Sequence, residues 1–404
     1  MSFGALAGLK IIDLTQMLAG PYTTMMLADH GAEVIKVEPP RGDMTRPNGP
    51  YRTDDKQRTH GGYFQSVNRN KKSIVLDLKS EAGREAFLKL VTTADVVVEN
   101  FRPGVMDKLG LSFERLRKDN PKLVYGALSG FGDPKTGLSP YVDWPAFDVV
   151  AQAMGGIMAI TGAKGGAPTK IGPGVGDIIP GMMLAFGILA ALHSARETGQ
   201  GQFIDVAMTD GVLAVCERMI YQHSVHGEIA VPQGDGHPFL CPFGQFPAAD
   251  GYVTIAAPAQ PHFNNLCQRL DAPELAEDPR FTSAEARSKN QAELKVLLAE
   301  VTRKFTKADL AIRLGGHVPF GPVMQMDEIA ADPHYAARAM IETIEQPGSN
   351  EPIQVAGVPV KMTQTPGGVY MRGPYLGEHT EAVLRAAGVS DAEIVKLINP
   401  KQDS

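Results

Sequence analysis

The sequence predicts an α/β protein whose larger domain is built around a parallel, Rossmann-like sheet. Short apolar runs and helix-length segments alternate through the first 130 residues of the 404-residue chain. Such alternation is typical of parallel sheets that are covered by helices on both faces. Strand and helix signals return after residue 352, and the length leaves room for a second, smaller α/β domain.

The first 130 residues hold the clearest elements. The segments expected to form strands are rich in apolar and β-branched side chains and lie at 10–14, 33–38, 73–78, 95–99 and 122–128. The segments 21–30 and 81–92 are expected to form helices. Ligands of such sheets bind beyond the carboxyl ends of the strands. These ends fall at 15–16, 38–39, 100–102 and 129–130.

The rest of the chain changes character several times. A loop rich in glycine and proline at 161–176 precedes a buried helix at 178–192, and a strand at 203–208 leads into a helix that reaches residue 226. The smaller domain is expected to begin with a linker or binding loop at 231–247. A strand at 252–257 and helical segments up to about residue 314 follow. Next comes a turn-rich boundary at 317–323. Strand-like alternation follows at 352–362, and a final helix is expected at 378–397.

Composition and charge narrow the class of protein. Hydrophobic residues at 43 % and charged residues at 21 % are ordinary for a globular protein, and a net charge of −6 argues against nucleic acid or an anionic membrane as the main partner. Cys216, Cys241 and Cys267 form no CxxC pair, so neither a disulfide framework nor a cysteine zinc site is expected. The N-terminus lacks signal-peptide features, and the longest apolar run, 178–192, is short for a bilayer span, so we expect a cytoplasmic protein.

Most familiar catalytic motifs are missing from the sequence. The turn after the first strand reads Leu18-Ala19-Gly20-Pro21 instead of GxGxxG, and no P-loop, HExxH or GxSxG occurs. His223 and His226 have a spacing that could suit a metal, but a third ligand is not apparent and packing or a solvated face is the favoured interpretation. We therefore expect no metal site.

Asp177 is the most informative residue. It ends the run Ile171-Gly172-Pro173-Gly174-Val175-Gly176-Asp177, whose glycines let another molecule approach the backbone closely, and it directly precedes the apolar helix with Pro180 in its first turn. A carboxylate at this place can serve as the N-cap of the helix. The same place also suits a functional carboxylate, because the first N–H groups of a helix have no partner within the helix and favour negative charge. The local residues alone favour the capping role.

Basic residues of the first domain suggest an anionic ligand. Arg69-Asn70-Lys71-Lys72, Lys79, Arg102 and Lys108 could neutralise the phosphates of a nucleotide-like molecule. Arg102 is the best placed, since it follows the strand at 95–99. The run Arg69 to Lys72 is more often a solvated turn.

Several motifs together resemble the family III coenzyme A (CoA) transferases, the carnitine/bile-acid type that includes formyl-CoA transferase. The matching segments occur in order along nearly the whole chain: Asp13-Leu14-Thr15, Ala19-Gly20-Pro21, Gly31 to Glu38, Asn68 to Ile74, Glu99 to Gly104, Gly176-Asp177, Gly321-Pro322-Val323 and Leu376 to Thr380. The resemblance implies a large Rossmann-like domain at 1–205, a linker at 206–230 and a small domain at 231–330. It also implies a second linker at 331–355 and a segment at 356–404 that returns to the large domain, in an interlocked homodimer.

The resemblance also implies a mechanism in which Asp177 is the nucleophile. An aspartate with an ordinary pKa of about 3.9 is ionised at neutral pH and needs no partner base. It would attack an acyl-CoA, form an anhydride and then an aspartyl-CoA thioester, and pass CoA to a carboxylic acid. Acyl-CoA and a carboxylic acid are then the substrates, CoA is no permanent cofactor, and glycine-loop N–H groups can stabilise the oxyanions.

By position in the family, a further set of residues is expected to contact CoA: Leu18, Ala19, Leu76, Lys79, Asn100, Phe101, Arg102, Lys108 and 144–147, including Phe147. A substrate loop is expected at Gly234, Gly236 and His237. Formyl-CoA transferases have glutamine where Leu18 stands, and consecutive glycines where this chain has His237-Pro238-Phe239-Leu240. These departures favour a bulkier acid, such as a dicarboxylate.

Two other functions share parts of this pattern. The family's 2-methylacyl-CoA racemases need an acid–base pair, and the position of their histidine is Phe147 here, which cannot exchange a proton. Phe147 suits either core packing or a role as a cover for the thioester. A non-catalytic CoA-binding protein would not need Asp177 and its glycines, yet both are intact.

Overall fold

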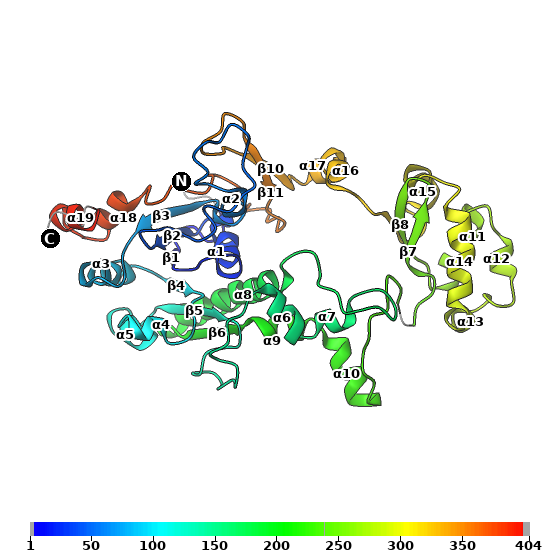
Figure 1. Ribbon diagram of the computed structural model, residues 1–404, viewed down its shortest axis with the longest axis horizontal. Coiled ribbons are helices and arrows are strands. Elements are labelled where there is room, and N and C mark those ends of the chain that lie inside the picture. The colour runs from blue at the N-terminus through cyan, green and yellow to red at the C-terminus, as the bar shows by residue number, and fades with distance from the viewer. Residues whose placement is uncertain (1–3, 238, 399–404) are drawn as a thin grey trace. The chain divides into compact units, whose positions relative to one another are not determined.

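The computed structural model describes residues 4–237 and 239–398, which divide into two compact units (Figure 1). Among the described residues, unit 1 consists of 4–157, 170–225 and 333–398, and unit 2 of 158–169, 226–237 and 239–332. The domain boundaries expected from the sequence stay a prediction. The α/β class is confirmed, with a parallel sheet in unit 1 and a smaller antiparallel sheet in unit 2.

Six strands of the described residues form one parallel sheet in unit 1, in the order β3-β2-β1-β4-β5-β6. The strands are β1 (Lys10–Asp13), β2 (Glu33–Glu38), β3 (Lys71–Val75), β4 (Val96–Glu99), β5 (Val124–Ser129) and β6 (Phe203–Ala207). The order reverses between β1 and β4, and sheets of this kind bind ligands beyond the strand ends at such a reversal.

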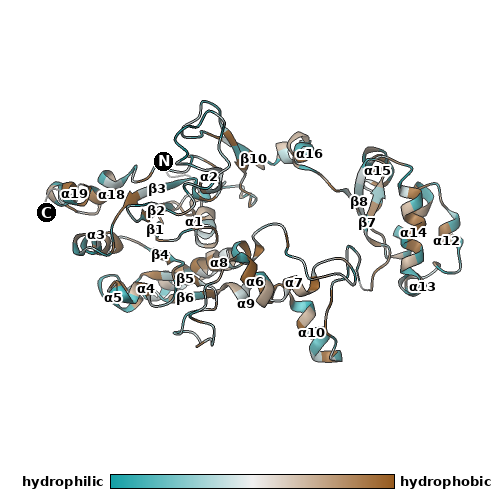
Figure 2. Ribbon diagram, in the orientation of Figure 1, coloured by the Kyte–Doolittle hydropathy of each residue, from teal (hydrophilic) through white to brown (hydrophobic). Residues whose placement is uncertain are grey.

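Two hydrophobic clusters bury the two faces of this sheet, because successive strand residues point to opposite sides. Ile12 belongs to one cluster, with α3 (Glu81–Val91), α5 (Phe113–Asp119), α18 (Thr380–Ala386) and α19 (Asp391–Ile398). Its neighbour Ile11 belongs to the other, with α1 (Ala19–Asp29), α8 (Val175–Thr198) and α9 (Met208–Ala214). Hydrophobic residues are frequent along α8 and the central strands (Figure 2).

Unit 1 contains several further elements. They are α2 (Gly62–Asn68), α4 (Val105–Lys108), α6 (Asp148–Met154), α10 (Glu217–His226), α17 (Pro333–Ala337) and the antiparallel pair β10 (Ile341–Ile344) and β11 (Ile353–Ala356), while α7 (Ile157–Ile160) spans the division in the chain. Helix α8 is longer than the predicted 178–192. By length and composition it could cross a membrane, but 44 % of its most apolar window is buried and it packs on α1, β5, β6 and α9 as a core helix does.

Unit 2 has its own core. The antiparallel strands β7 (Phe243–Ala248), β8 (Gly251–Ala256) and β9 (Phe320–Pro322) share this core with the helices α11 (Gln260–Arg269), α12 (Glu274–Glu277), α14 (Gln291–Thr302) and α15 (Lys307–Leu314). The helices α13 (Ala284–Lys289) and α16 (Met326–Ala331) also belong to this unit. Two predictions are wrong here. The end of the expected loop at 231–247 forms most of β7, and the expected turn-rich boundary at 317–323 contains β9, because both segments pair with β8.

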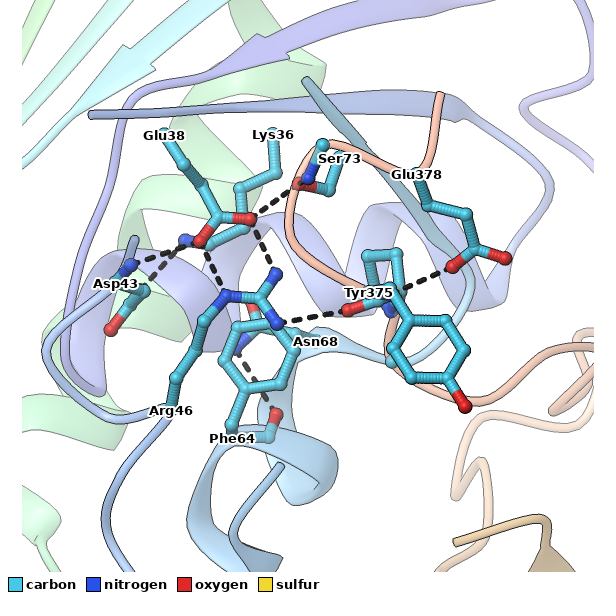
Figure 3. A network of polar contacts seen from close by, with 12 residues as sticks. Lys36, Glu38, Asp43, Arg46, Phe64, Asn68, Ser73, Tyr375 and Glu378 are labelled. Carbon is cyan, nitrogen blue, oxygen red and sulfur yellow. Dashed lines mark hydrogen bonds and ion pairs between the residues drawn. The ribbon is translucent and has the colours of Figure 1, made fainter. Parts of the chain in front are cut away.

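A buried polar network joins β2 to a distant part of the chain (Figure 3). The Arg46 guanidinium binds both carboxylate oxygens of Glu38, at 2.6 and 2.7 Å, and donates to the Pro374 carbonyl oxygen at 3.0 Å. Ser73 Oγ donates to Glu38 at 2.6 Å and accepts the backbone N–H of Gly377 at 2.9 Å. The C-terminal segment is therefore fixed to the sheet by hydrogen bonds to buried groups.

The basic run Arg69 to Lys72, at the start of β3, forms neither the solvated turn nor the phosphate site that the sequence suggested. Arg69 is buried against Asp29 at 2.7 Å, and Lys71 is buried with its Nζ 3.0 Å from Asp13. Burial of two ion pairs requires close geometry and further hydrogen bonds, which Asn68 and the Pro21 carbonyl supply to Lys71. The strand therefore begins at Lys71, two residues earlier than predicted.

Candidate active site

A cavity of about 660 Å³ lies at the carboxyl ends of β1, β4 and β5, at the reversal of strand order. Its lining residues come from the segments that follow these strands, from the loop after β2, and from α2, α6, α8 and α9: Gln16 to Ala19, Arg41, Met44, Tyr63, Asn100 to Pro103, Leu128 to Gly130, Val142, Trp144 to Asp148, Gly174, Asp177 and Met208. The predicted ligand edge of the sheet is thus hollow.

The loops after β1 and β4 are clamped together by one side chain. The side-chain oxygen Oδ1 of Asn100 accepts the backbone N–H of Gln16, and the side-chain nitrogen Nδ2 of Asn100 donates to the backbone carbonyl oxygen of Gln16, both at 2.8 Å. Next to this clamp, Met17 has a φ of 70°, a conformation that is uncommon outside glycine. The two hydrogen bonds hold the strained turn that presents Leu18 and Ala19 to the cavity.

Asp177 is not the N-cap of α8, contrary to the local prediction. The helix begins at Val175, its N-cap is Gly174, and Asp177 is the third helical residue. Pro180 consequently lies in the second turn and not in the first. Among the described residues, no side chain or backbone group forms a hydrogen bond or ion pair with the Asp177 carboxylate, which lines the cavity and is half-buried.

The capping role at α8 belongs to Asp148, the first residue of α6. Its Oδ1 accepts the backbone N–H of Gly176 at 2.8 Å, and its Oδ2 lies 3.3 Å from Lys170 Nζ. Gly176 permits this approach, because a Cβ at that position would lie 2.5 Å from the Asp148 carbonyl oxygen. The carboxylate of Asp177 is thereby left available for other chemistry.

The pKa of Asp177 departs from the ordinary value that the sequence argument assumed. Burial, and second the negative charge of Asp148, raise the pKa of Asp177 to about 7. Burial, and second the charge of Asp177, also raise the pKa of the neighbouring Tyr63 to about 12. A carboxylate with a raised pKa is a stronger nucleophile once ionised, but near neutral pH a substantial share of it is protonated.

The structure brings together most of the residues that were expected to contact CoA. Leu18, Ala19, Asn100, Phe101, Arg102 and Phe147 all line the cavity with Asp177. Three other residues that were expected to contact CoA are not among the described residues that line this cavity. Leu76 is buried in the core, and Lys79 and Lys108 are exposed. Gly234, Gly236 and His237 belong to unit 2, where they line a separate cavity of about 610 Å³ with Lys164 and Lys295.

Sequence reasoning missed several lining residues. Arg41 follows the strand end at 38–39, which was recognised as a ligand edge without this arginine being named. Tyr63 lies on α2, a helix that was not predicted. Asp148 was given no role of its own, although an acidic residue at the start of a helix is a common signal for a role near a positive helix end.

Comparison with known proteins agrees with this geometry. The sequence profile of CoA-transferase family III matches residues 6–380, and the chain belongs to this family. It is 48 % identical to the succinyl-CoA:mesaconate CoA-transferase of Haloarcula hispanica over 96 % of this chain and 97 % of that protein. It is also 40 % identical to the succinyl-CoA–D-citramalate CoA-transferase of Chloroflexus aurantiacus, over 96 % and 95 % of the two chains.

A solved structure gives the same result at the level of the fold. The crystal structure of a CAIB/BAIF family protein from Brucella suis has a TM-score of 0.85 with this chain, at 36 % identity, and the match covers 95 % of this chain and 100 % of that one. The resemblance predicted from the sequence is therefore confirmed, and the chain is an enzyme of the CoA-transferase class.

Proposed function

We propose that this enzyme transfers CoA from an acyl-CoA donor to a dicarboxylic acid through an aspartyl-CoA thioester on Asp177. The observation that carries the proposal is that two carboxylates at the start of α8 have different surroundings. Asp148 satisfies the helix N-terminus, while the Asp177 carboxylate faces the cavity with no partner among the described residues. A carboxylate in that position is accessible to an acyl group, and its raised pKa makes it a stronger nucleophile once it is ionised.

The proposed reaction has four steps, and no net proton transfer is needed. An Asp177 oxygen attacks the thioester carbonyl, the C–S bond breaks, and CoA leaves as a thiolate, which gives an aspartyl–acyl anhydride. The thiolate attacks the aspartyl carbonyl, forms the aspartyl-CoA thioester and releases the donor acid as a carboxylate. The acceptor carboxylate then attacks the aspartyl carbonyl of this thioester, the C–S bond breaks, and an aspartyl–acceptor anhydride forms. The thiolate attacks the acceptor's carbonyl in this anhydride, which yields the new acyl-CoA and releases the Asp177 carboxylate.

The charges around the cavity suit anionic substrates. Arg41 and Arg102 line the cavity and are exposed, so their guanidinium groups are free to bind phosphate or carboxylate groups in bidentate fashion. Leu18, Phe147 and Trp144 supply an apolar wall. Apolar walls exclude water from the anhydride and thioester, whose hydrolysis would end the cycle without transfer.

The acceptor acid is proposed to be a dicarboxylate of the mesaconate type, with a succinyl-CoA-like donor. The activities of the relatives at 48 % and 40 % identity support this choice. Leu18 supports it as well, because it takes the place of the glutamine of formyl-CoA transferases. We further propose that Lys79, Lys108 and the backbone at Leu76 take part in CoA binding only at its periphery, and that Gly234, Gly236 and His237 select the acid.

We also propose that the enzyme is a cytoplasmic, interlocked homodimer without a permanent cofactor, with the domain boundaries expected from the sequence. Several large apolar side chains of unit 1 are exposed on α8 and α10: Met182, Phe186, Leu189, Ile220, Tyr221 and Val225. An exposed apolar surface of this kind marks an interaction site. A second copy of the chain is the proposed occupant.

Chemical trapping tests the covalent step. Incubation with succinyl-CoA followed by hydroxylamine or borohydride should modify the peptide that contains Asp177, as read by mass spectrometry. Asp177→Ala should abolish transfer but still bind CoA, because the cavity cations are unchanged. Full turnover by Asp177→Ala, or an unmodified peptide while transfer proceeds, would refute the mechanism. A panel of mono- and dicarboxylic acids, separated by chromatography, identifies the acceptor.

A further inference from the structure

Gln152 is completely buried on α6, one turn after Asp148, and its side chain contacts both segments that build the start of α8. Its amide nitrogen lies 2.9 and 3.0 Å from the two carboxylate oxygens of Asp148. Its carbonyl oxygen accepts the backbone N–H of Ile171 at 2.9 Å. One neutral side chain thus binds the capping carboxylate and the glycine-rich loop at the same time.

The contacts form a chain that ends at Asp177. Gln152 orients Asp148, and Asp148 binds the N–H of Gly176, the residue before Asp177. From the other side, Gln152 holds Ile171, and the four residues from Ile171 to Gly174 lead directly into the helix. The position of the first turn of α8 is therefore fixed at two points by the same amide.

An amide is the side chain that satisfies both contacts without adding charge, since it carries a donor and an acceptor. A carboxylate in its place would repel Asp148, and an aliphatic side chain would leave the Ile171 N–H without its acceptor. Both changes would release the loop, since an unsatisfied buried polar group is costly. The buried site selects for glutamine on these grounds.

We propose that Gln152 is a positioning residue for CoA transfer, which fixes Asp148 and the loop 171–174 and thereby holds Asp177 in the orientation needed for attack on the acyl group. This proposal rests on the proposed role of Asp177. Gln152 is not among the described residues that line the cavity, so it acts only through Asp148 and the backbone.

The charged and titratable groups around this arrangement come from four segments. Asp148 lies on α6, Lys170 precedes the loop, Asp177 lies on α8 and Tyr63 on α2. Lys170 also donates to the carbonyl oxygens of Ile171 and Gly172, at 2.8 and 3.1 Å. A carboxyl group introduced at position 152 would therefore add one titrating group, directly beside Asp148.

Gln152→Glu tests the proposal by pH. When protonated, the new side chain keeps the shape of the amide, with an O–H that donates to Asp148 and a carbonyl that accepts from Ile171. When ionised, it repels Asp148. The ratio of kcat for the variant to kcat for the wild type should therefore approach one at acidic pH and fall on the order of 100-fold at alkaline pH, with little change in KM for acyl-CoA.

Gln65→Glu is the matched control, since Gln65 is also fully buried in unit 1 and accepts the Gly373 N–H at 2.9 Å. Its kcat ratio should not depend on pH over the range in which thermal unfolding shows a folded protein. A flat ratio for Gln152→Glu, or the same pH dependence in Gln65→Glu, overturns the proposal. Gln152→Leu should have low kcat at every pH, and if it does not fold, the Gln152→Glu ratio decides.

The outcome is distinguishable from a failure of the proposed function. If the wild type transfers CoA and hydroxylamine marks Asp177, the covalent route stands whatever Gln152→Glu does. If neither occurs, the proposed function is refuted, and the role of Gln152, which rests on it, is refuted with it. A pH-independent Gln152→Glu ratio in an enzyme with a marked Asp177 refutes only the role of Gln152.

Discussion

The Oδ1 of Asp148 lies 2.8 Å from the backbone nitrogen of Gly176, so a side chain from α6 completes the N-terminus of α8. The carboxylate that the sequence favoured for this role, Asp177, lies one residue further and is directed to the cavity. Two carboxylates thus share one helix end. One of them stabilises the helix. Burial, and second the charge of this carboxylate, raise the pKa of the other.

Asp148→Asn should shift the acidic limb of the pH–rate profile to lower pH. The side-chain oxygen of the new amide can still accept the N–H of Gly176, but the negative charge that raises the pKa of Asp177 is gone. Burial still raises that pKa, so the limb should remain above the ordinary range of aspartate. The measurement is kcat against pH. Asp143→Asn, an exposed change nearby, should leave the profile unmoved, and an unchanged limb in Asp148→Asn would contradict the electrostatic account.

Asp177→Asn should make the protein more stable above neutral pH. The pKa of Asp177 is about 7 when folded and near 3.8 when unfolded, so between these values the folded state binds more protons and stability falls as pH rises. The amide carries no such penalty. The gain in Tm over wild type should therefore grow from pH 4 to pH 8, at roughly 1–2 °C per kcal/mol for a chain of this length. An equal Tm difference at both pH values would speak against a raised pKa.

Gly176→Ala should lose activity and stability because its methyl group would lie 2.5 Å from the Asp148 carbonyl oxygen and 3.1 Å from the Ala151 Cβ. Overpacking of this kind costs about 1–3 kcal/mol. Gly172→Ala is the control, since a methyl group there meets nothing within 4 Å. Urea unfolding and kcat measure both effects, and equal behaviour of the two variants would show that the close approach at Gly176 is unimportant.

Lys71→Met should destabilise unit 1 by about 3–5 kcal/mol, because it leaves Asp13 as a buried charge without its partner. Its neighbour supplies the control. The Lys72 side chain is 38 % exposed and pairs with Glu33 at the surface, so Lys72→Met should cost about 1 kcal/mol or less. Denaturant unfolding measures the difference, and similar losses for both variants would contradict the importance of burial.

Phe186→Glu should weaken self-association. Phe186 is 75 % exposed on α8, and a charge buried in an apolar interface is costly. Analytical ultracentrifugation should show a larger share of monomer than in the wild type. Ile312→Glu on α15 is a control with similar exposure, at 81 %. A wild-type monomer would remove the dimer proposal altogether.

The sequence was sufficient for the parallel sheet because its strands are runs of buried apolar residues whose pattern is local. It failed where partners are distant. Arg69 and Lys71 looked like exposed charges, and their partners Asp29 and Asp13 lie 40 and 58 residues earlier in the chain. The strands β7 and β9 were missed for the same reason, since each is stabilised by pairing with β8.

The candidate site was predicted in part. The strand ends and the family resemblance together indicated Asp177, Asn100 and Arg102, which line one cavity. The helix start was misplaced because Val175 and Gly176 carry no local signal of their own, and the capping residue comes from another helix. The raised pKa of Asp177 depends on burial and on Asp148, and neither can be read from neighbouring residues.

The hydrogen bond between Ser73 and Gly377 has a consequence for biosynthesis. It joins residues 304 positions apart, and the buried Glu38 and Arg46 depend on the same contact region. At a synthesis rate of about 5–20 residues per second, roughly 15 to 60 s separate the two residues as they are made. During this interval the early strands wait on the ribosome with charged groups that still lack their last partners. The first part of the chain to be translated is therefore among the last to be completed.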